Sequence, residues 1–283
     1  MDKNTLNKIL FYLYIINKMK KALLIGINYI GTKYELGGCI NDINDIQELL
    51  TKKYNYLTKN INVLTDNTQI KPTKKDIQDA ILQFVKDVSA GDTLFFYYSG
   101  HGSQILVDKL SDNYDDVLVP IDYHQSGFIT DEWLYDNLAN ILPKGVTLWS
   151  FADCCHSGTI LNLEYNLIHT RTENIDKTEY KETDWLDQYT LFLIKNSKKK
   201  IDTQADVYMI SGCMDNQTSA DTGTQGAFTS CFLETIKNKN QNLNPKIIEV
   251  LKEIDCRLNI GGFEQVCQLS IGILDDINKE LLF

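Results

Sequence analysis

The residues with the clearest chemical potential are His101 and Cys155, each of which follows a hydrophobic segment. His101 lies in the sequence YSGHG at 98–102, and Cys155 lies in DCCHSG at 153–158, 54 residues further along the chain. A cysteine with a histidine about 50 residues upstream is a known arrangement of nucleophile and base. The imidazole can accept the thiol proton, and the thiolate can then attack a carbonyl carbon. The pair therefore predicts nucleophilic catalysis at one shared site.

Each of these residues alone has a simpler explanation. A histidine in a glycine-containing loop is more often structural than catalytic, and a cysteine at a strand end is more often part of the core. Both occur here in turns that contain glycine, which lets the backbone turn tightly and approach a ligand closely. The two contexts together favour the catalytic interpretation.

A catalytic pair so far apart in sequence needs a scaffold that brings the two loops together. Apolar runs predict strands at 22–28, 61–64, 93–98, 146–152, 207–210 and 265–271. Helical spacing or capping predicts helices at 40–50, after Thr73, and at 131–142, 227–236 and 245–258. Strands that alternate with helices favour a parallel sheet with helices on both faces. The residues that follow the strands should then meet at one edge of the sheet.

The chain is expected to form one domain at 19–283 behind an extension at 1–18. The extension contains an apolar run of eight residues, too short to span a membrane and followed by no signal-cleavage site. A helix that binds a membrane surface or a partner is the alternative for this run. Within the domain we expect a larger catalytic part at 19–163, a polar, exposed linker at 164–205 and a smaller part at 206–283.

Composition excludes some functions and suggests a location. The formal net charge of −10 argues against nucleic-acid binding, which needs a basic surface to displace phosphate counterions. The seven cysteines are odd in number, irregularly spaced and without a CxxC pair, as expected for reduced thiols in a cytoplasmic protein. We expect no membrane span.

Several segments, in order along the chain, carry a family resemblance. They are GCIND at 38–42, YSGHG at 98–102, the run at 112–122 that begins DNYD and ends PID, DCCHSG at 153–158, SGCMDNQTSAD at 211–221 and GAFT at 226–229. Through these segments the sequence resembles a metacaspase of the type I arrangement without a long pro-domain, and the resemblance covers most of the chain after Ala22. The resemblance implies a caspase-like α/β/α sandwich with a mostly parallel central sheet. It also implies a cysteine endopeptidase that cleaves protein or peptide substrates after Arg or Lys, acts as a monomer and uses no organic cofactor.

The resemblance assigns roles to individual residues. Cys155 is the implied nucleophile and His101 the implied base, while the backbone N–H groups of Gly102 and Cys155 form the oxyanion hole. Such N–H donors stabilise the negative charge that develops on the carbonyl oxygen. Cys154 stands where the family often has Ser or Ala, so it is not assigned as the nucleophile.

Four further residues are implied around the pocket for the residue before the cleaved bond. They are Cys39, Asp42, Ser99 and Asp153. Two carboxylates in one cleft would bind a guanidinium or ammonium group, with a bidentate arginine contact as the strong form. The alternatives are that Asp42 caps the helix that begins near Cys39 and that Asp153 only orients its loop.

The resemblance also implies an activating calcium ion. The matching ligands are Asp115, Asp131, Glu132 and Asn162, and calcium prefers several hard oxygen ligands of this kind. Glu132 and Asn162 both replace an Asp of the family pattern, and Asn162 removes one formal charge. Without a metal, Asp131 and Glu132 would suit the start of a helix, where acidic residues favour the helix dipole.

Other functions fit the sequence less well than a peptidase does. A non-catalytic caspase-fold scaffold or regulatory protein would usually lack the cysteine or the histidine, and a calcium-responsive binding module would need only the acidic residues. A serine nucleophile is not indicated, because the sequence contains no GxSxG motif. Lys198, Lys199 and Lys200, or Arg171, are candidate self-processing sites, although a solvated loop would contain such residues too.

Overall fold

The structure is a computed structural model. It describes residues 18–108, 113–155, 157–170, 190–195, 203–213, 220, 223–238, 245–273, 279–281 and 283. The extension predicted at 1–18 lies outside this part of the chain except for its last residue. The candidate self-processing residues Arg171 and Lys198 to Lys200 also lie outside it.

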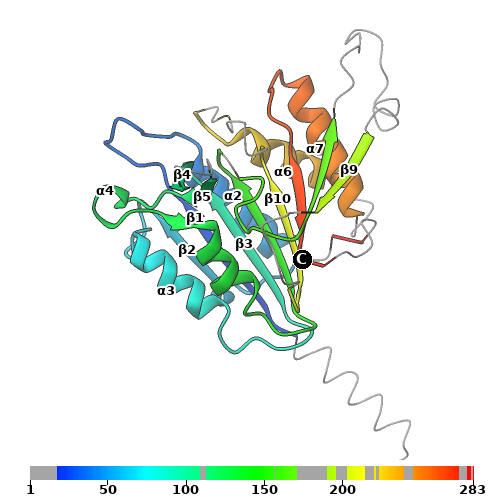
Figure 1. The fold of residues 1–283 in the computed structure, drawn as a ribbon, viewed down its shortest axis with the longest axis horizontal. Coiled ribbons are helices and arrows are strands. Elements are labelled where there is room, and N and C mark those ends of the chain that lie inside the picture. The colour runs from blue at the N-terminus through cyan, green and yellow to red at the C-terminus, as the bar shows by residue number, and fades with distance from the viewer. Residues whose placement is uncertain are drawn as a thin grey trace, which may run out of the picture.

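A large sheet forms the centre of the molecule (Figure 1). Its strands are β1 (Lys20–Gly26), β2 (Ile61–Thr65), β3 (Thr93–Ser99), β7 (Thr147–Asp153), β8 (Tyr165–Thr170), β9 (Thr190–Lys195), β10 (Asp206–Ser211) and β11 (Gln268–Ile271). Within the described residues it has eight strands in the order β2-β1-β3-β7-β10-β11-β8-β9. The first five are parallel, and the pairs β10–β11, β11–β8 and β8–β9 are antiparallel. The sheet is therefore mostly parallel, as predicted.

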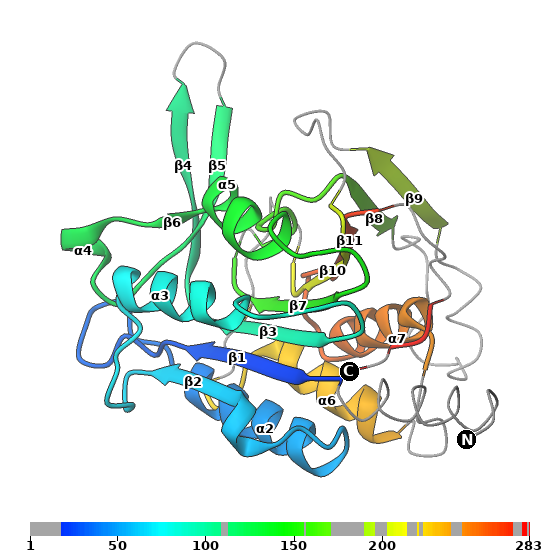
Figure 2. The same cartoon turned by 90° about the horizontal axis from the view of Figure 1, so that it is seen from below.

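Helices cover both faces of the sheet (Figure 2). One face carries α2 (Cys39–Lys52), α6 (Ala227–Asn238) and α7 (Ile247–Ile260), and the other carries α3 (Lys74–Phe84), α5 (Asp131–Leu134) and the π-helical turn η2 (Tyr135–Ala139). Side chains of a strand alternate between the two layers, so Leu24 packs with the first group and Leu23 with the second. These layers confirm the α/β/α sandwich.

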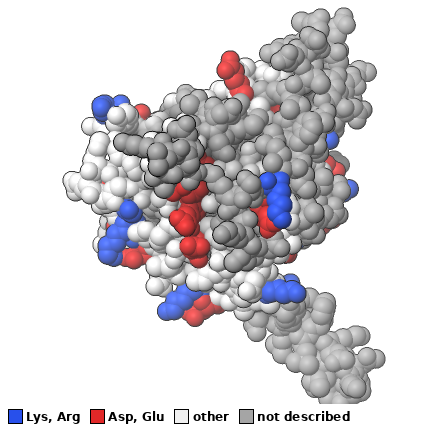
Figure 3. Space-filling model, in the orientation of Figure 1, with Lys and Arg blue, Asp and Glu red and all other residues white. Residues whose placement is uncertain are grey.

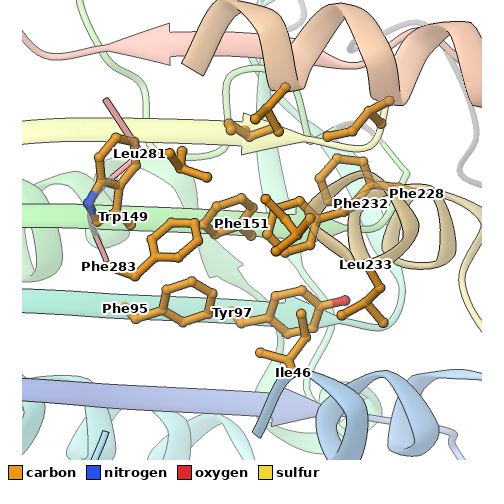
Figure 4. Packing of buried hydrophobic residues seen from close by; sticks show 14 of the residues in the cluster. Ile46, Phe95, Tyr97, Trp149, Phe151, Phe228, Phe232, Leu233, Leu281 and Phe283 are labelled. Atoms are coloured by element: carbon orange, nitrogen blue, oxygen red, sulfur yellow. The ribbon is translucent and has the colours of Figure 1, made fainter. Parts of the chain in front are cut away.

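Aromatic side chains hold β3 and β7 together under α6 (Figure 4). The rings of Phe95 and Phe151 stack with centroids 5.1 Å apart. Phe283 packs edge-on against Phe95 at 5.2 Å and against Trp149 at 5.6 Å. Edge-to-face and offset contacts of this kind are the favoured geometries for aromatic pairs. The two strands that precede the catalytic candidates therefore lie on a well-packed core.

A smaller antiparallel sheet lies beside the large one and was not predicted. It contains β4 (Gly102–Asp108), β5 (Asn113–Leu118) and β6 (Ile129–Thr130). Figure 2 shows β4 and β5 extending away from the large sheet. The short helix α4 (Tyr123–Ser126) lies between β5 and β6, and the 3-10 turn η1 (Thr58–Asn60) precedes β2. Since β4 begins directly after His101, this sheet is continuous with the candidate active site.

Two expectations from the sequence are corrected. The stretch at 164–205, expected to be an exposed linker, contributes β8 and β9 to the large sheet within its described residues. The helix expected at 131–142 is α-helical only as far as Leu134 and continues as a π-helical turn, in which Asn140 N donates to Tyr135 O at 2.8 Å. The division into a larger and a smaller part stays a prediction.

Two observations concern nucleic-acid binding and membrane insertion. On the face in Figure 3, the described Lys and Arg side chains are scattered and form no broad basic patch. None of the helices in the described part of the chain has both the length and the apolar character to cross a membrane.

Candidate active site

The two catalytic candidates leave the same edge of the large sheet from neighbouring strands. β3 and β7 pair in register with Ser99 opposite Asp153, and His101 and Cys155 each follow two residues later. Gly100 N donates to Asp153 O at 3.3 Å, so the two loops stay joined beyond the last strand residues. The predicted convergence of these two loops is therefore present in the structure.

The loops touch directly at Gly102. A β-carbon on Gly102 would lie 2.0 Å from the carbonyl oxygen of Cys155, a distance that no real contact allows. Only glycine permits this approach of the two backbones. The backbones expected to supply the oxyanion hole are therefore in contact, while their role in catalysis stays a prediction.

A pocket of about 140 Å³ lies between these loops. His101, Cys155, Cys39, Ser99 and Asp153 all line it. Leu36, Gly100, Ala220 and Gly226 complete its lining. The structure thus brings together the candidate nucleophile, the candidate base and three of the four predicted substrate-binding residues.

Two buried carboxylates lie at the base of this region. Asp42 is fully buried and accepts hydrogen bonds from Ser99 Oγ at 2.7 Å and from Gly226 N at 3.0 Å. Asp153 is 5% exposed and accepts hydrogen bonds from Thr229 N at 3.0 Å and from Thr229 Oγ1 at 2.6 Å. Since burying a charge is costly unless hydrogen bonds compensate it, these contacts hold both carboxylates in place. Asp42 points its carboxylate at the pocket wall, which favours the pocket role over helix capping.

Gly226 separates the two carboxylates. A β-carbon there would lie 2.1 Å from Asp153 Oδ2 and 3.0 Å from Asp42 Oδ2, so both carboxylates lie against this one α-carbon. The buried hydroxyl of Tyr97 forms a hydrogen bond with Thr229 Oγ1. Burial, and then the charges of Asp42 and Asp153, raise the pKa of Tyr97 well above its usual value, so this phenol stays neutral. Thr229 and Gly226 were not predicted as individual site residues, although they lie in the GAFT segment.

The backbone around His101 fixes the orientation of its ring. Nε2 lies 2.8 Å from the carbonyl oxygen of Tyr34. A carbonyl oxygen only accepts, so Nε2 carries the proton in neutral imidazole and Nδ1 is the nitrogen that can accept one. Tyr34 was not predicted as a site residue, because it acts through its backbone carbonyl, which every residue type has.

Tyr29 supports the same histidine from beneath. Its hydroxyl donates to Val119 O at 2.6 Å and accepts the backbone N–H of His101 at 3.0 Å. Its ring centroid lies 4.7 Å from that of His101. Tyr29 is buried and has a positive φ of 51°, a conformation that is uncommon for a bulky residue. These features were not recognised in the sequence, where Tyr29 only ends an apolar run.

The cysteines differ in their capacity to ionise. None of the seven forms a disulfide in the described part of the chain, and Cys155 is partly exposed whereas Cys154 is buried. Burial raises the pKa of Cys154 well above its usual value, and burial raises the pKa of Cys213 to about 11. Because the thiolate is the reactive form, both buried residues are poor nucleophiles at neutral pH. The contrast supports Cys155 over its neighbour.

The predicted calcium ligands are less closely gathered. Asp115 lies in β5 and is partly buried, Asp131 is buried at the start of α5, and Glu132 is exposed. Asn162 lies in the loop after β7 with a positive φ of 47°. Across the described ranges, no three Asp, Glu, His or Cys side chains are arranged to hold a metal ion.

The contacts at this region match those of a helix start. Thr130 accepts the backbone N–H of Trp133 at 3.2 Å, and Asp131 Oδ1 accepts that of Glu132 at 2.6 Å. A second buried carboxylate in this region, that of Asp116, was not among the predicted ligands. It accepts a hydrogen bond from Gln104 Nε2 at 2.9 Å and another from Thr159 Oγ1.

Comparison with known sequences identifies clear relatives. The family model described as the metacaspase, peptidase C14 domain matches residues 20–164. Metacaspase-2 of Trypanosoma brucei brucei is 35% identical over 275 residues, which cover 92% of this chain and 75% of that protein. Metacaspase-1 of Candida albicans is 34% identical over 307 residues, which cover 93% of this chain and 67% of that protein.

Solved structures agree with this comparison. A protein from Geobacter sulfurreducens superposes with a TM-score of 0.66 at 25% identity, covering 92% of this chain and 97% of its own. Caspase-1 from Spodoptera frugiperda superposes with a TM-score of 0.57 at 13% identity, covering 91% of this chain and 90% of its own. At 13% identity the second likeness concerns the fold alone, and it confirms the expected caspase-like architecture.

Proposed function

Because this chain belongs to the metacaspase family of cysteine peptidases, we propose that it is an endopeptidase that cleaves after Arg or Lys, with Cys155 as nucleophile and His101 as base. The observation that carries the proposal is the pocket that His101, Cys155 and Asp153 line together. Asp42 lies behind Ser99 in the same wall. A nucleophile, a base and a negatively charged binding site thus meet within one small volume.

The orientation of His101 supports a direct role in proton transfer. With the Nε2 proton donated to the Tyr34 carbonyl, Nδ1 accepts the proton of the Cys155 thiol. The thiolate sulfur attacks the carbonyl carbon of the substrate, and the oxyanion is stabilised by the backbone N–H groups of Gly102 and Cys155. When the tetrahedral intermediate collapses, the proton on Nδ1 passes to the leaving amine and a thioester remains. Water hydrolyses the thioester with the same histidine as base.

The two buried carboxylates support selectivity for a basic residue before the cleaved bond. Asp153 lines the pocket, and Asp42 reaches it through the Ser99 hydroxyl. A guanidinium can donate to two acceptors at once, which gives a geometric as well as an electrostatic fit. An acidic substrate side chain would instead meet two like charges, so cleavage after Asp is disfavoured.

We also propose that calcium stimulates the activity through Asp115, Asp131, Glu132 and Asn162. These side chains supply only oxygen donors, which suits calcium, but they form no ready cluster of three acidic ligands in this structure. No catalytic step described above passes through the ion. Calorimetry with calcium alone tests the site directly. If an Asp131→Asn variant bound calcium as tightly as the unmodified protein, these four residues would be ruled out as the calcium ligands.

The remaining proposals concern the cellular compartment and the oligomeric state of the protein. The seven cysteines form no disulfide in the described part of the chain, which supports a reducing compartment such as the cytoplasm. A monomer is expected, and light scattering coupled to size exclusion would test it.

The central experiment compares three fluorogenic peptides that differ only in the residue before the cleaved bond: Arg, Lys or Asp. Each is assayed with millimolar calcium and with a chelator, and the Cys155→Ala variant serves as control. Cleavage of the Arg and Lys peptides only, raised by calcium and absent from the variant, would support the full proposal. Cleavage of the Asp peptide would overturn the selectivity, and no cleavage in any condition would favour a non-catalytic scaffold.

A further inference from the structure

A second pocket, of about 270 Å³, opens beside His101. Besides His101 and Gly102, it is lined by Tyr34, Ser103, Val119, Tyr123 and Phe128. His101 lines both this pocket and the pocket that contains Cys155 and Asp153, and no other residue lines both. His101 therefore joins the two pockets: it lines one together with the proposed nucleophile and the other together with the aromatic residues.

The walls of this second pocket are mainly aromatic. The rings of Tyr123 and Phe128 stack with centroids 5.8 Å apart, and the ring of Tyr34 meets that of Tyr123 edge-on at 6.5 Å. Val119 is buried, and Tyr34 is 44% exposed. No Asp, Glu, Lys or Arg lines the pocket among the described residues. Such a surface gains free energy when it covers an apolar side chain and has no charge with which to pair an ionic one.

The chemistry of cleavage decides which part of a substrate reaches this pocket. The proposed function places the basic side chain before the cleaved bond in the pocket with Asp153. His101 must reach the nitrogen of the leaving amine to protonate it, so the residue that follows the bond lies against the imidazole. Its side chain can then enter the neighbouring aromatic pocket, which His101 lines but Cys155 does not.

We infer that the pocket formed by Tyr34, Tyr123 and Phe128 binds the residue immediately after the cleaved bond and selects a large apolar or aromatic side chain. This inference rests on the proposed function, because it needs a peptide bond held between Cys155 and His101. One competing feature lies at the rim. The ammonium of Lys33 is 4.7 Å from the centre of the Tyr34 ring and could attract an acidic side chain instead.

The test uses four internally quenched peptides that share Arg before the cleaved bond and differ only in the next residue: Phe, Leu, Ala or Asp. We expect kcat/KM to be about 10-fold higher for Phe and Leu than for Ala, the lower end of what an apolar pocket discriminates, because the lining is partly exposed. The Asp peptide should be the poorest substrate.

Two variants probe the pocket from opposite directions. Phe128→Ala removes part of the wall, and Ser103→Phe fills the space, and both should bring the ratio of kcat/KM for the Phe peptide to that for the Ala peptide close to one. Ile141→Ala is the matched control, because Ile141 is an exposed apolar residue, 56% accessible, that does not line the pocket. Its ratio should equal that of the unmodified protein.

The outcomes separate the subsite from the proposed function. Equal cleavage of all four peptides after Arg, or a preference for Asp, would overturn the subsite and leave the peptidase intact. A preference for Phe that survives both pocket variants would also overturn it. No cleavage of any peptide would overturn the proposed function and the subsite with it. Circular dichroism of each variant confirms that a lost ratio does not come from unfolding.

Discussion

Asp42 and Asp153 are 111 residues apart in sequence, yet both carboxylates lie against the α-carbon of Gly226 at the edge of the large sheet. Asp131 and Glu132 are adjacent in sequence, yet one is buried and the other is exposed. The first pair occupies one place because the first turn of α2, which carries Asp42, lies against the sheet edge at which β3 ends with Ser99 and β7 ends with Asp153. The second pair diverges because successive residues at a helix start point in different directions. Proximity in sequence is therefore a poor guide to which acidic residues share a site.

The two regions also differ in how their charges are compensated. At the sheet edge, hydrogen bonds from Ser99, Gly226 and Thr229 hold the carboxylates in place before any substrate arrives. Beside the smaller sheet, the carboxylate of Asp131 accepts a backbone N–H at a helix start, and the carboxylate of Asp116 accepts a hydrogen bond from the Gln104 side chain. Changes at the sheet edge should therefore act on catalysis and selectivity, whereas changes beside the smaller sheet should act on the calcium response.

The largest effect should come from Cys155→Ala at the sheet edge. Removing a catalytic nucleophile costs at least about 10³-fold in kcat, and the melting temperature should change little because Cys155 is partly exposed. Cys154→Ala is the matched control and should keep most of the activity. Peptide cleavage and thermal unfolding of both variants provide the measurement, and the reverse order of activities would make Cys154 the nucleophile.

Alkylation tests the difference in reactivity between Cys155 and Cys154 without mutation. Iodoacetamide at pH 7.5 should label Cys155 well before Cys154 and Cys213, because burial raises the pKa of both buried thiols and keeps them protonated there. As the pH rises toward 11, labelling of Cys213 should increase, since its pKa is about 11. Peptide mass spectrometry measures the order, and equal labelling of all three at pH 7.5 would contradict it.

The next largest effect should come from Asp153→Asn. This change removes the charge but keeps an oxygen that accepts from Thr229, so kcat/KM for an Arg peptide should fall about 100-fold while the melting temperature shifts little. Asp131→Asn is the comparison in the other region and should leave activity in chelator unchanged. If the melting temperature of Asp153→Asn collapsed, the residue would be structural and the contrast between the two regions would fail.

A smaller effect is expected for Tyr29→Phe. The variant loses the hydroxyl that joins Val119 O to the His101 N–H, so His101 should be less well placed and kcat should fall about 10-fold with KM unchanged. Tyr56→Phe is the control, because its buried hydroxyl has no hydrogen-bond partner among the described residues. Equal losses in both variants would count against the positioning role.

The smallest effect should come from Asn162→Asp. It restores a carboxylate in the predicted calcium set, and Asp tolerates the positive φ of this position nearly as well as Asn. We expect the calcium concentration for half-maximal activity to fall about threefold to tenfold, with activity in chelator unchanged. A calcium titration of cleavage gives the result, and an unchanged midpoint would remove Asn162 from the set.

The parts of the fold that could be predicted are those with buried parallel strands. β1, β3 and β7 are apolar on both faces, so they appear in the sequence as continuous apolar runs. β4, β5 and β6 combine polar residues with a few core residues such as Leu118 and Ile129, so they form no continuous apolar run in the sequence. β8 and β9 lie at the end of the sheet within a polar stretch, and the pairing of β8 with β11 and of β9 with β8 depends on contacts made only in the folded chain.

The candidate site shows a similar division. His101 and Cys155 were expected because their residue types and glycine-containing loops follow predicted strands, whereas Asp153 was expected from the family resemblance. Tyr34 and Tyr29 were not, since one acts through a backbone carbonyl and the other through a hydroxyl whose partners lie far along the chain. Contacts of this kind depend on the fold and leave no pattern of residue types.

The pairing of β3 with β7 has a consequence for how such proteins can vary. The loops that carry His101 and Cys155 are neighbours because adjacent strands lie about 4.8 Å apart. The segment between β3 and β7, residues 100–146, which includes β4, β5, β6 and α5, does not set this distance. That segment is therefore free to lengthen, shorten or acquire a new loop over evolution without separating the proposed nucleophile from the proposed base, provided that it leaves β3 and returns to β7 in the same register.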